Sequence, residues 1–238
     1  MKIIVLSLTN YKEKDVIVNA ISNEEYLTFN AHGVLSPTSK NSAINNLLAI
    51  AEVELTKSNK SGHYSLKECS VINLPFILGN DFNYMVSINL LAEATNAMLD
   101  EEERPQAFNY LETAILAIKK SKYPLLVAIS YLSKMMKLAG YSFEINRCVK
   151  CGSKRNIVSF TFEEGGYVCK DCLDESDKCD LTIDQLMLIR TLAGSPDFEF
   201  NKVDYNEDSA KILLDKFIKF INDIGGVKLS SADIIINN

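Results

Sequence analysis

Tryptophan is absent from the 238 residues of this chain, and histidine occurs only as His32 and His63. The missing tryptophan reflects coding bias more than chemistry. Neither histidine is followed by the x-Glu of a zinc deaminase, and no third ligand of an open zinc site is evident. Glycine-rich phosphate loops and the Gly-x-Ser-x-Gly nucleophile elbow are missing too. These absences argue against the common nucleotide-dependent and acyl-transfer enzymes, so we expect a protein that is not an enzyme.

Long apolar runs are also missing. No stretch reaches the roughly twenty apolar residues of a membrane span, and the N-terminus lacks the charged region and small-residue cleavage site of a signal peptide. We therefore expect a cytoplasmic protein with no membrane partner. Thiols stay reduced in that compartment, which disfavours disulfides among the six cysteines.

Acidic residues are scarce in one part of an acidic chain. The formal net charge is -6, yet residues 113–162 contain nine cations and a single acid, Glu144. This asymmetry predicts a positive face on an otherwise acidic molecule, the alternative being a solvated helix face. The nine cations are Lys119, Lys120, Lys122, Lys134, Lys137, Arg147, Lys150, Lys154 and Arg155.

Four cysteines lie in two short hooks, Cys148-x2-Cys151 and Cys169-x2-Cys172, with seventeen residues between the hooks. This spacing is typical of a zinc site, and four protein ligands would leave no position for water. We therefore predict a structural zinc, with disulfides or unremarkable cysteines as the alternatives. The apolar alternation before Gly165-Gly166 predicts a hairpin that carries the hooks, a zinc ribbon. The role of Cys179 stays open.

The remaining pattern predicts an α+β chain. Residues 1–79 contain five short strand-like runs between polar turns, which suits a five-stranded OB-fold barrel. Residues 80–145 and 180–238 change to helical spacing and should form one helical bundle, into which the ribbon at residues 146–179 is inserted. Pro124 should begin one of these helices, and Thr182 should cap another.

Three stretches resemble the RecO family of bacterial recombination mediators. The first is Gly33-Val34-Leu35-Ser36-Pro37-Thr38-Ser39-Lys40 with the strand after it, and the second is the helix that begins Phe108-Asn109-Tyr110-Leu111. The third and most specific is Leu138-Ala139-Gly140-Tyr141 followed by the four-cysteine stretch. Relatives carry more Arg and Lys in the barrel turn, whereas residues 1–80 here hold seven cations and seven acids.

The resemblance implies a non-enzymatic protein of DNA repair and recombination at the nucleoid. It implies binding of single- and double-stranded DNA, annealing of complementary strands, and loading of RecA with RecR onto strands coated by single-strand-binding protein. The acidic C-terminal tail of that coat protein is a further implied partner.

Lysine and arginine neutralise phosphates without reading sequence, so the candidate DNA contacts are cations. They are Lys40, Lys119, Lys120, Lys122, Lys150, Lys154 and Arg155. A competing hypothesis is a recruitment adaptor with little DNA affinity, in which cations of one helix flank an apolar groove for an acidic tail. Its candidate residues are Tyr131, Lys134, Met135 and Lys137, with both lysines on the outer face. A third hypothesis is a zinc-ribbon transcription or ribosome-associated factor.

Overall fold

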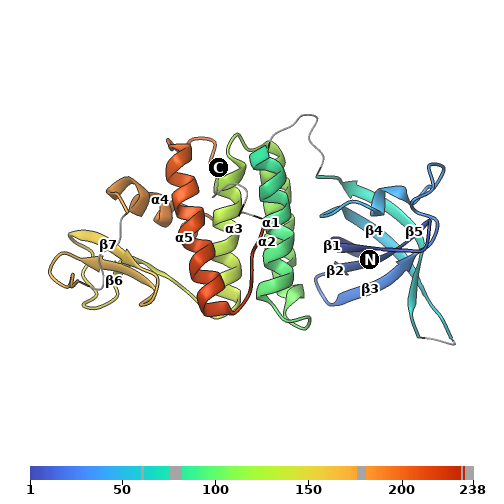
Figure 1. Cartoon of the computed structure of the whole chain (residues 1–238), viewed down its shortest axis with the longest axis horizontal. Coiled ribbons are helices and arrows are strands. Elements are labelled where there is room, and N and C mark those ends of the chain that lie inside the picture. The colour runs from blue at the N-terminus through green and yellow to red at the C-terminus, as the bar shows by residue number, and fades with distance from the viewer. Residues whose placement is uncertain (60–61, 76–81, 176–180, 232, 234–238) are drawn as a thin grey trace.

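In the computed structural model a barrel and a small ribbon lie at opposite ends of a helical bundle (Figure 1). The structure describes residues 1–59, 62–75, 82–175, 181–231 and 233. None of the described helices is long and apolar enough to cross a membrane. The predicted α+β architecture of barrel, bundle and inserted four-cysteine ribbon is confirmed.

Five strands close the barrel in the order β1-β2-β3-β5-β4, an OB-like arrangement. Closure occurs where β1 pairs antiparallel with β4, and β3 and β5 pair in parallel. The strands are β1 (Lys2–Tyr11), β2 (Asp15–Ile21), β3 (Tyr26–Ala31), β4 (Ile50–Lys57) and β5 (Tyr64–Asn73), with a 3-10 turn at Ser42–Ile44.

Strand β1 is buried on both faces near its start. Ile3 and Val5 belong to the core inside the barrel, whereas Ile4 and Leu6 pack with the helices. Successive strand side chains point to opposite faces, so an uninterrupted apolar run places β1 between two cores. The barrel is therefore attached to the bundle by one of its strands.

Polar contacts add to this junction. Asn96 donates its amide to the Leu6 carbonyl at 3.1 Å, and Lys2 forms an ion pair with Glu112. The Arg104 guanidinium lies 4.7 Å from the centre of the Tyr26 ring. These contacts join β1 and β3 to α1 (Phe82–Met98), α2 (Phe108–Lys120) and the turn between those helices.

Five α-helices are described, and α3 contacts each of α1, α2, α4 and α5. Because helices from both sides of the ribbon pack on α3, the ribbon is an insertion into one bundle, as predicted. The helices are α1 (Phe82–Met98), α2 (Phe108–Lys120), α3 (Pro124–Leu138), α4 (Ile183–Gly194) and α5 (Glu207–Gly225), with a 3-10 turn at Arg104–Ala107.

Helix ends agree with their local sequence. Pro124 occupies the first turn of α3, where its missing N–H costs nothing. Thr182 caps α4 in a capping box with Gln185, and Asn206 caps α5. Gly140 follows α3 with φ of 89°, a conformation that glycine adopts without strain.

The ribbon is a three-stranded sheet of order β6-β8-β7, built from β6 (Glu144–Cys148), β7 (Ile157–Thr161) and β8 (Gly166–Cys169). The expected hairpin is β7–β8. Strand β6 was not predicted, because it pairs in parallel with β8 and no turn joins the two. The expected alternation fails at Val158, which is 37% exposed at a register shift in β7.

The predicted limits between the parts stay predictions. The ribbon begins structurally at Glu144, two residues before its expected limit at residue 146. The other two limits fall at residues 79–80 and 179–180, outside the described residues, as does Cys179.

Candidate metal centre and nucleic-acid interface

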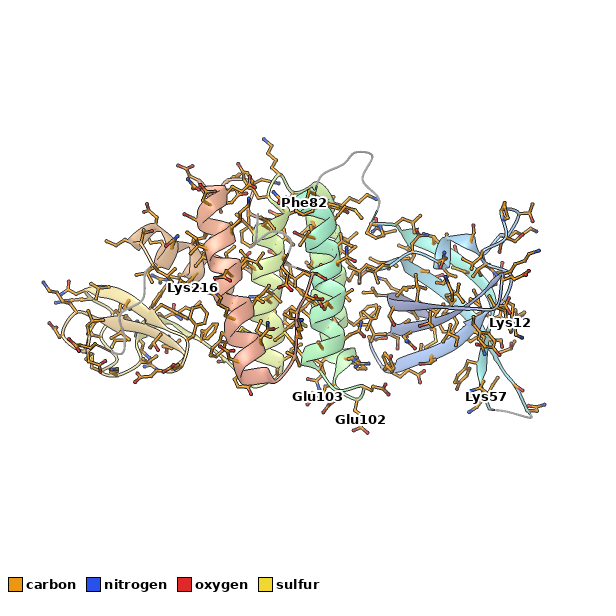
Figure 2. The ribbon with its side chains drawn as sticks, viewed as in Figure 1. Lys12, Lys57, Phe82, Glu102, Glu103 and Lys216 are labelled. Carbon is orange, nitrogen blue, oxygen red and sulfur yellow. The ribbon has the colours of Figure 1, made fainter. Side chains whose placement is uncertain are left out.

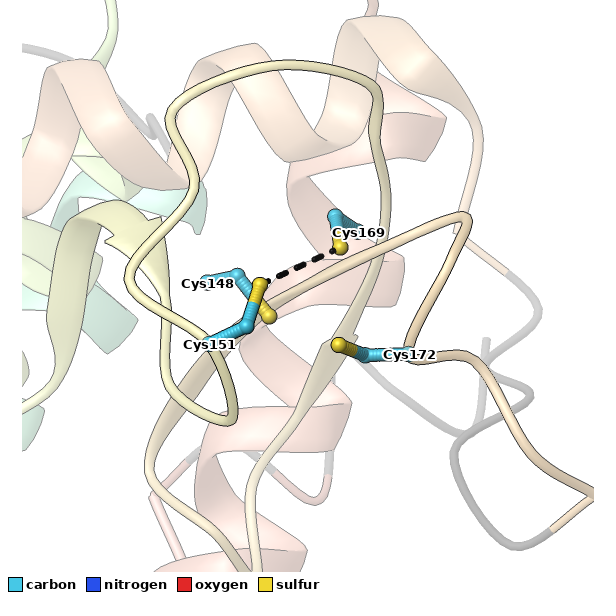
Figure 3. Close-up of side chains that lie close together, drawn as sticks. All are labelled: Cys148, Cys151, Cys169 and Cys172. Carbon is cyan, nitrogen blue, oxygen red and sulfur yellow. Dashed lines mark hydrogen bonds between the residues drawn. The ribbon is translucent and has the colours of Figure 1, made fainter.

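The two cysteine hooks face each other at the end of the ribbon (Figure 3). Cys148 ends β6 and Cys169 ends β8, and each hook continues into the turn that holds its second cysteine. The four sulfur atoms all lie within 4.8 Å of one another, and the Sγ atoms of Cys151 and Cys169 are 3.7 Å apart. The folded chain thus brings all four predicted ligands together.

This cluster fits a tetrahedral metal ion. With metal–sulfur bonds of about 2.3 Å, tetrahedral geometry places the sulfurs about 3.8 Å apart. The measured 3.7 Å is close to that value. The cluster could therefore hold a metal ion with only small movements of the side chains.

Backbone hydrogen bonds shape the first hook. Gly152 donates to the Cys148 carbonyl at 2.8 Å, and Cys148 donates to the Ser153 carbonyl at 2.7 Å. Gly152 has φ of 74°, a conformation that glycine adopts without strain and that lets the chain turn back after Cys151. In the second hook Cys172 donates to the Cys169 carbonyl at 3.1 Å. Each hook is a closed turn that holds its two sulfurs on one side.

The thiols have unequal proton affinities. Burial by itself raises the Cys148 pKa, but hydrogen bonds from the backbone N–H groups of Cys169, Cys151 and Lys150 lower that pKa to about 6. Hydrogen bonding with the side chains of Cys151 and Cys169 raises the Cys172 pKa to about 12. Four thiolates cannot share so small a volume without a cation, which a metal ion would supply.

The opposite end of the ribbon packs on α5 through aromatic rings. Phe143 lies 5.1 Å from Phe160, 5.7 Å from Phe162 and 5.8 Å from Phe217 between ring centres, all nearly perpendicular. Tyr167 donates its hydroxyl to a carbonyl of α4, and burial raises the Tyr167 pKa to about 12. The ribbon therefore has two supports, a sulfur cluster at one end and an aromatic cluster at the other.

The predicted single positive face is wrong, because the cations of residues 113–162 lie on separate parts of the molecule. Lys119, Lys120 and Lys122 lie at the end of α2 and after it, whereas Lys150, Lys154 and Arg155 lie in the ribbon. Helices α3 and α5 stand between these two groups (Figure 1).

Several of these cations are already engaged. Lys119 donates to the Asn73 side chain at 3.1 Å and to the Leu74 carbonyl at 3.2 Å. Lys150 forms ion pairs with Asp174 at 2.8 Å and Glu164 at 3.7 Å. Within the described residues Lys120, Lys122, Lys154 and Arg155 are exposed and form no ion pair. These four keep their charge for an outside partner.

The predicted partner-tail groove on α3 is wrong. Tyr131 and Met135 are completely buried, and the Tyr131 hydroxyl lies 2.6 Å from the Thr95 hydroxyl in the core. Lys134 is half-buried, not on an outer face, and donates to the Ala193 carbonyl at the end of α4, 2.7 Å away. Burial and the neighbouring Lys137 lower the Lys134 pKa. Only Lys137 is exposed as expected.

On the barrel, Lys40 is exposed in the segment before the first 3-10 turn. Sequence reasoning missed two lysine–tyrosine pairs there. The Lys12 ammonium lies 5.0 Å from the centre of the Tyr11 ring, and Lys57 lies 5.3 Å from that of Tyr64. Lys12 and Lys57 both lie on the side of the barrel away from the helices (Figure 2). The adjacent residues Tyr11-Lys12 at the end of β1 were the available signal for the first pair, whereas Lys57 and Tyr64 meet only as partners across β4 and β5.

Comparison with known proteins identifies the family. The family model described as "Recombination protein O C terminal" matches residues 79–226, which is more than half of the chain. The chain belongs to the RecO family. The match begins just before α1 and spans the bundle and the ribbon, so the four-cysteine cluster lies inside the RecO region.

Full-length relatives extend the similarity to the barrel. The "DNA repair protein RecO" of Caldicellulosiruptor bescii is 26% identical over 207 residues, which is 84% of this chain and 82% of that protein. The one of Mesoplasma florum is 26% identical over 233 residues, 93% of this chain and 85% of that protein. The one of Oceanobacillus iheyensis is 21% identical over 236 residues. Membership of this family supports a role in DNA repair.

Proposed function

We propose that this chain binds single- and double-stranded DNA and anneals complementary strands without catalysing a reaction. The observation that carries the proposal is the pair of lysine-capped tyrosines on the outer side of an OB-like barrel. Bases stack on aromatic rings whatever their sequence, and lysines neutralise phosphates. A surface with both groups suits a strand held without sequence preference, which is what annealing requires.

The proposed DNA surface begins on the barrel with Tyr11, Lys12, Lys57 and Tyr64, and Lys40 extends it. Tyr11 is 45% exposed, so part of its side chain is accessible to a base. The exposed cations lie in two further places, Lys120 and Lys122 at the end of α2 and Lys154 and Arg155 in the ribbon, and the ribbon pair is the proposed contact for a second strand or a duplex. Lys119 and Lys150 contribute less in this proposal, because their ammonium groups are bonded within the chain.

We propose zinc as the metal of the cysteine cluster. Four thiolates suit zinc, and a site with four protein ligands has no open position for a reacting water. The ion then has a structural role, which is to hold the hooks and the ribbon cations Lys154 and Arg155 in place. Strand binding at the barrel would not involve the ion.

The test is anisotropy of a fluorescein-labelled thirty-nucleotide thymidine strand against salt, with a strand-annealing assay beside it. The variant Lys12→Glu with Lys57→Glu should weaken binding about tenfold and flatten the salt slope, since each phosphate contact adds about 0.7 to that slope. Lys154→Glu with Arg155→Glu should slow annealing more than single-strand binding. The matched control is Lys211→Glu with Lys219→Glu on α5, two surface lysines that form i,i+4 pairs.

Unchanged affinity and salt slope in the barrel variant, or an equal loss in the α5 control, would refute the barrel surface. In the pathway implied by the family, RecR and RecA act with this protein at the nucleoid. Annealing as proposed needs neither, so the assay uses the chain alone.

The second candidate function is recruitment of acidic tails. Because the prediction of a groove on α3 is wrong, the proposed binding site for the tail is a groove beside α2. This groove encloses about 450 Å³ and is lined by Leu116, which is 41% exposed, with Lys120 and Lys202 at its edge. That volume is in the range of ligand pockets. Asp197 and Glu199 also line it and partly offset the lysines.

A peptide with the acidic sequence of the C-terminal tail of single-strand-binding protein should therefore bind the Lys120→Glu, Lys202→Glu variant more weakly. Its affinity for the α5 control variant should be unchanged. Tight peptide binding with weak DNA binding at physiological salt would favour the adaptor over the annealing protein. Peptide binding that survives the Lys120 and Lys202 changes would place the tail elsewhere.

A further inference from the structure

A second groove lies at the other end of the bundle, where three helices finish together. The ends of α1 and α3 and the segment after α5 enclose about 360 Å³, a volume in the range of ligand pockets. Its apolar wall is formed by Ala97, Met98, Met136, Tyr141, Phe220 and Val227.

The wall of this groove is open to solvent at its aromatic side. Tyr141 is 41% exposed and meets Phe220 edge-on, with ring centres 6.4 Å apart. Phe220 is itself only partly buried. Two aromatic side chains that remain accessible beside a cavity provide a site for one apolar side chain of a partner.

The rim of the groove is strongly acidic. Asp100 and Glu103 line the cavity, and Glu101 and Glu102 lie between them in the turn after α1. Glu102 and Glu103 project beyond the ends of the helices (Figure 2). Among the described residues only Glu101 of these four has an ion-pair partner, at the long distance of 3.9 Å from Arg104.

The cation nearest in sequence does not neutralise this rim. Arg104 donates to the Leu99 carbonyl at 3.1 Å and to the Asn96 carbonyl at 2.9 Å, and its guanidinium covers the Tyr26 ring. The helix ends around the groove also carry charged residues, which are the exposed Lys137, Asp223 and Lys228, and Lys219, which pairs with Asp215 at 2.7 Å. The lining itself contains two acids and no cation.

We propose that this groove docks a short basic segment of a partner protein. One apolar side chain of the segment enters between Met136, Tyr141 and Phe220, and lysines or arginines on either side meet Asp100, Glu102 and Glu103. Opposite charges at the rim steer such a partner and exclude the wrong ones. The acidic rim repels DNA and acidic tails, so this surface is separate from both sites proposed above. It binds a partner of positive charge, whereas those sites bind partners of negative charge.

The probes are three fluorescein-labelled hexapeptides measured by anisotropy against the full chain. Lys-Lys-Leu-Phe-Lys-Lys has the charge and the anchor, Glu-Glu-Leu-Phe-Glu-Glu has only the anchor, and Lys-Lys-Gly-Gly-Lys-Lys has only the charge. Binding of the first peptide alone is expected. If the glycine peptide binds equally well, the interaction is a general attraction of cations to an acidic protein, and the proposal that the groove binds an apolar anchor is refuted.

Location is tested by charge reversal. Glu102→Lys with Glu103→Lys should weaken the first peptide by about tenfold, the equivalent of ~1.4 kcal/mol shared between two surface charges. Glu13→Lys with Glu24→Lys, two exposed barrel acids, makes the same change in net charge and should alter affinity less than about twofold. An equal loss in both pairs, or none in the first, would overturn the proposal.

Tyr141→Ala tests the apolar part without touching the rim. This substitution should weaken binding of the peptide Lys-Lys-Leu-Phe-Lys-Lys. The circular dichroism spectrum and DNA binding should stay unchanged, since Tyr141 is a surface residue after α3. Should the reversed rim misfold, Glu102→Gln with Glu103→Gln replaces it, with a smaller loss expected. If both Tyr141→Ala and the glutamine variant bind the peptide Lys-Lys-Leu-Phe-Lys-Lys with full affinity, the proposal that this groove docks a basic segment is refuted.

Discussion

Metal removal should unfold the hooks of the ribbon and leave its aromatic end folded. The structure gives the reason, because the two ends rest on different contacts. Among the described residues around the cysteines, Val168 is the one completely buried aliphatic side chain, and its burial contributes about 1.5–3 kcal/mol. Phe160, by contrast, belongs to the main core of the bundle and is also completely buried.

The burial of Val168 alone does not supply enough free energy to keep the hooks ordered. Ordering the backbone costs about 1–2 kcal/mol for each residue, so residues 147–156 and 169–173 together cost on the order of 15–30 kcal/mol. Their backbone hydrogen bonds return about 1 kcal/mol each. A structural zinc contributes about 10–16 kcal/mol, which is the size of the missing amount.

Hydrogen exchange with mass spectrometry is the assay, before and after chelation, with zinc measured in the same samples. Amides of residues 147–156 and 169–173 should lose protection, while those of α3 and of β7 around Phe160 keep it. Cys148→Ala and Cys169→Ala should each lower zinc content. Cys69→Ser is the control, since Cys69 is a half-buried free thiol in β5 of the barrel. Protected hook amides in zinc-free protein would refute the reasoning.

Two further substitutions test other contacts. Glu93 accepts hydrogen bonds from the N–H groups of Ser230 and Ser231 at 2.8 and 2.9 Å, which lower the Glu93 pKa against the opposing effect of burial. Because the folded pKa is depressed, this stabilisation is present above the ordinary pKa of 4.5 and is lost as pH falls through the folded value. Glu93→Gln should therefore speed exchange of the amides at 227–231 at pH 7, and a difference between variant and parent that does not shrink as pH falls through the folded pKa of Glu93 would contradict this. Tyr131→Phe should cost about 1 kcal/mol in chemical denaturation, since it leaves Thr95 bonded to the Leu91 carbonyl. It should not change binding of an acidic peptide, and a loss there would restore the groove on α3.

The cysteine cluster could be predicted because its geometry is local. Two residues between Cys148 and Cys151 fix one hook whatever the rest of the chain does, and the same holds for Cys169 and Cys172. The five strands and the helix starts were likewise visible, since Pro124 and Thr182 act on their own helices. These predictions depend on neighbours in sequence, which is the information that a sequence pattern contains.

The surface of α3 could not be predicted, because it depends on how many helices surround it. An amphipathic pattern suggests one outer face, yet α3 is buried nearly all round by α1, α2, α4 and α5. Lys134 therefore lies between helices, where its flexible stem carries the ammonium to the Ala193 carbonyl. Parallel pairing hid β6 for a similar reason, since its partner β8 is distant in sequence.

The separation of the cysteine cluster from the barrel makes the two proposed DNA surfaces distinguishable. The ribbon, which contains the cysteine cluster, lies at one end of the molecule, and the barrel, which carries the lysine–tyrosine pairs, lies at the other (Figure 1). Under these proposals, removal of zinc should slow the annealing assigned to Lys154 and Arg155, while the binding of a single thymidine strand assigned to Lys12 and Lys57 persists. If chelation abolishes single-strand binding while hydrogen exchange shows an intact barrel, the ribbon holds the strand and the barrel does not. If chelation changes neither activity, the ribbon cations lie outside the DNA interface and the metal serves the fold alone.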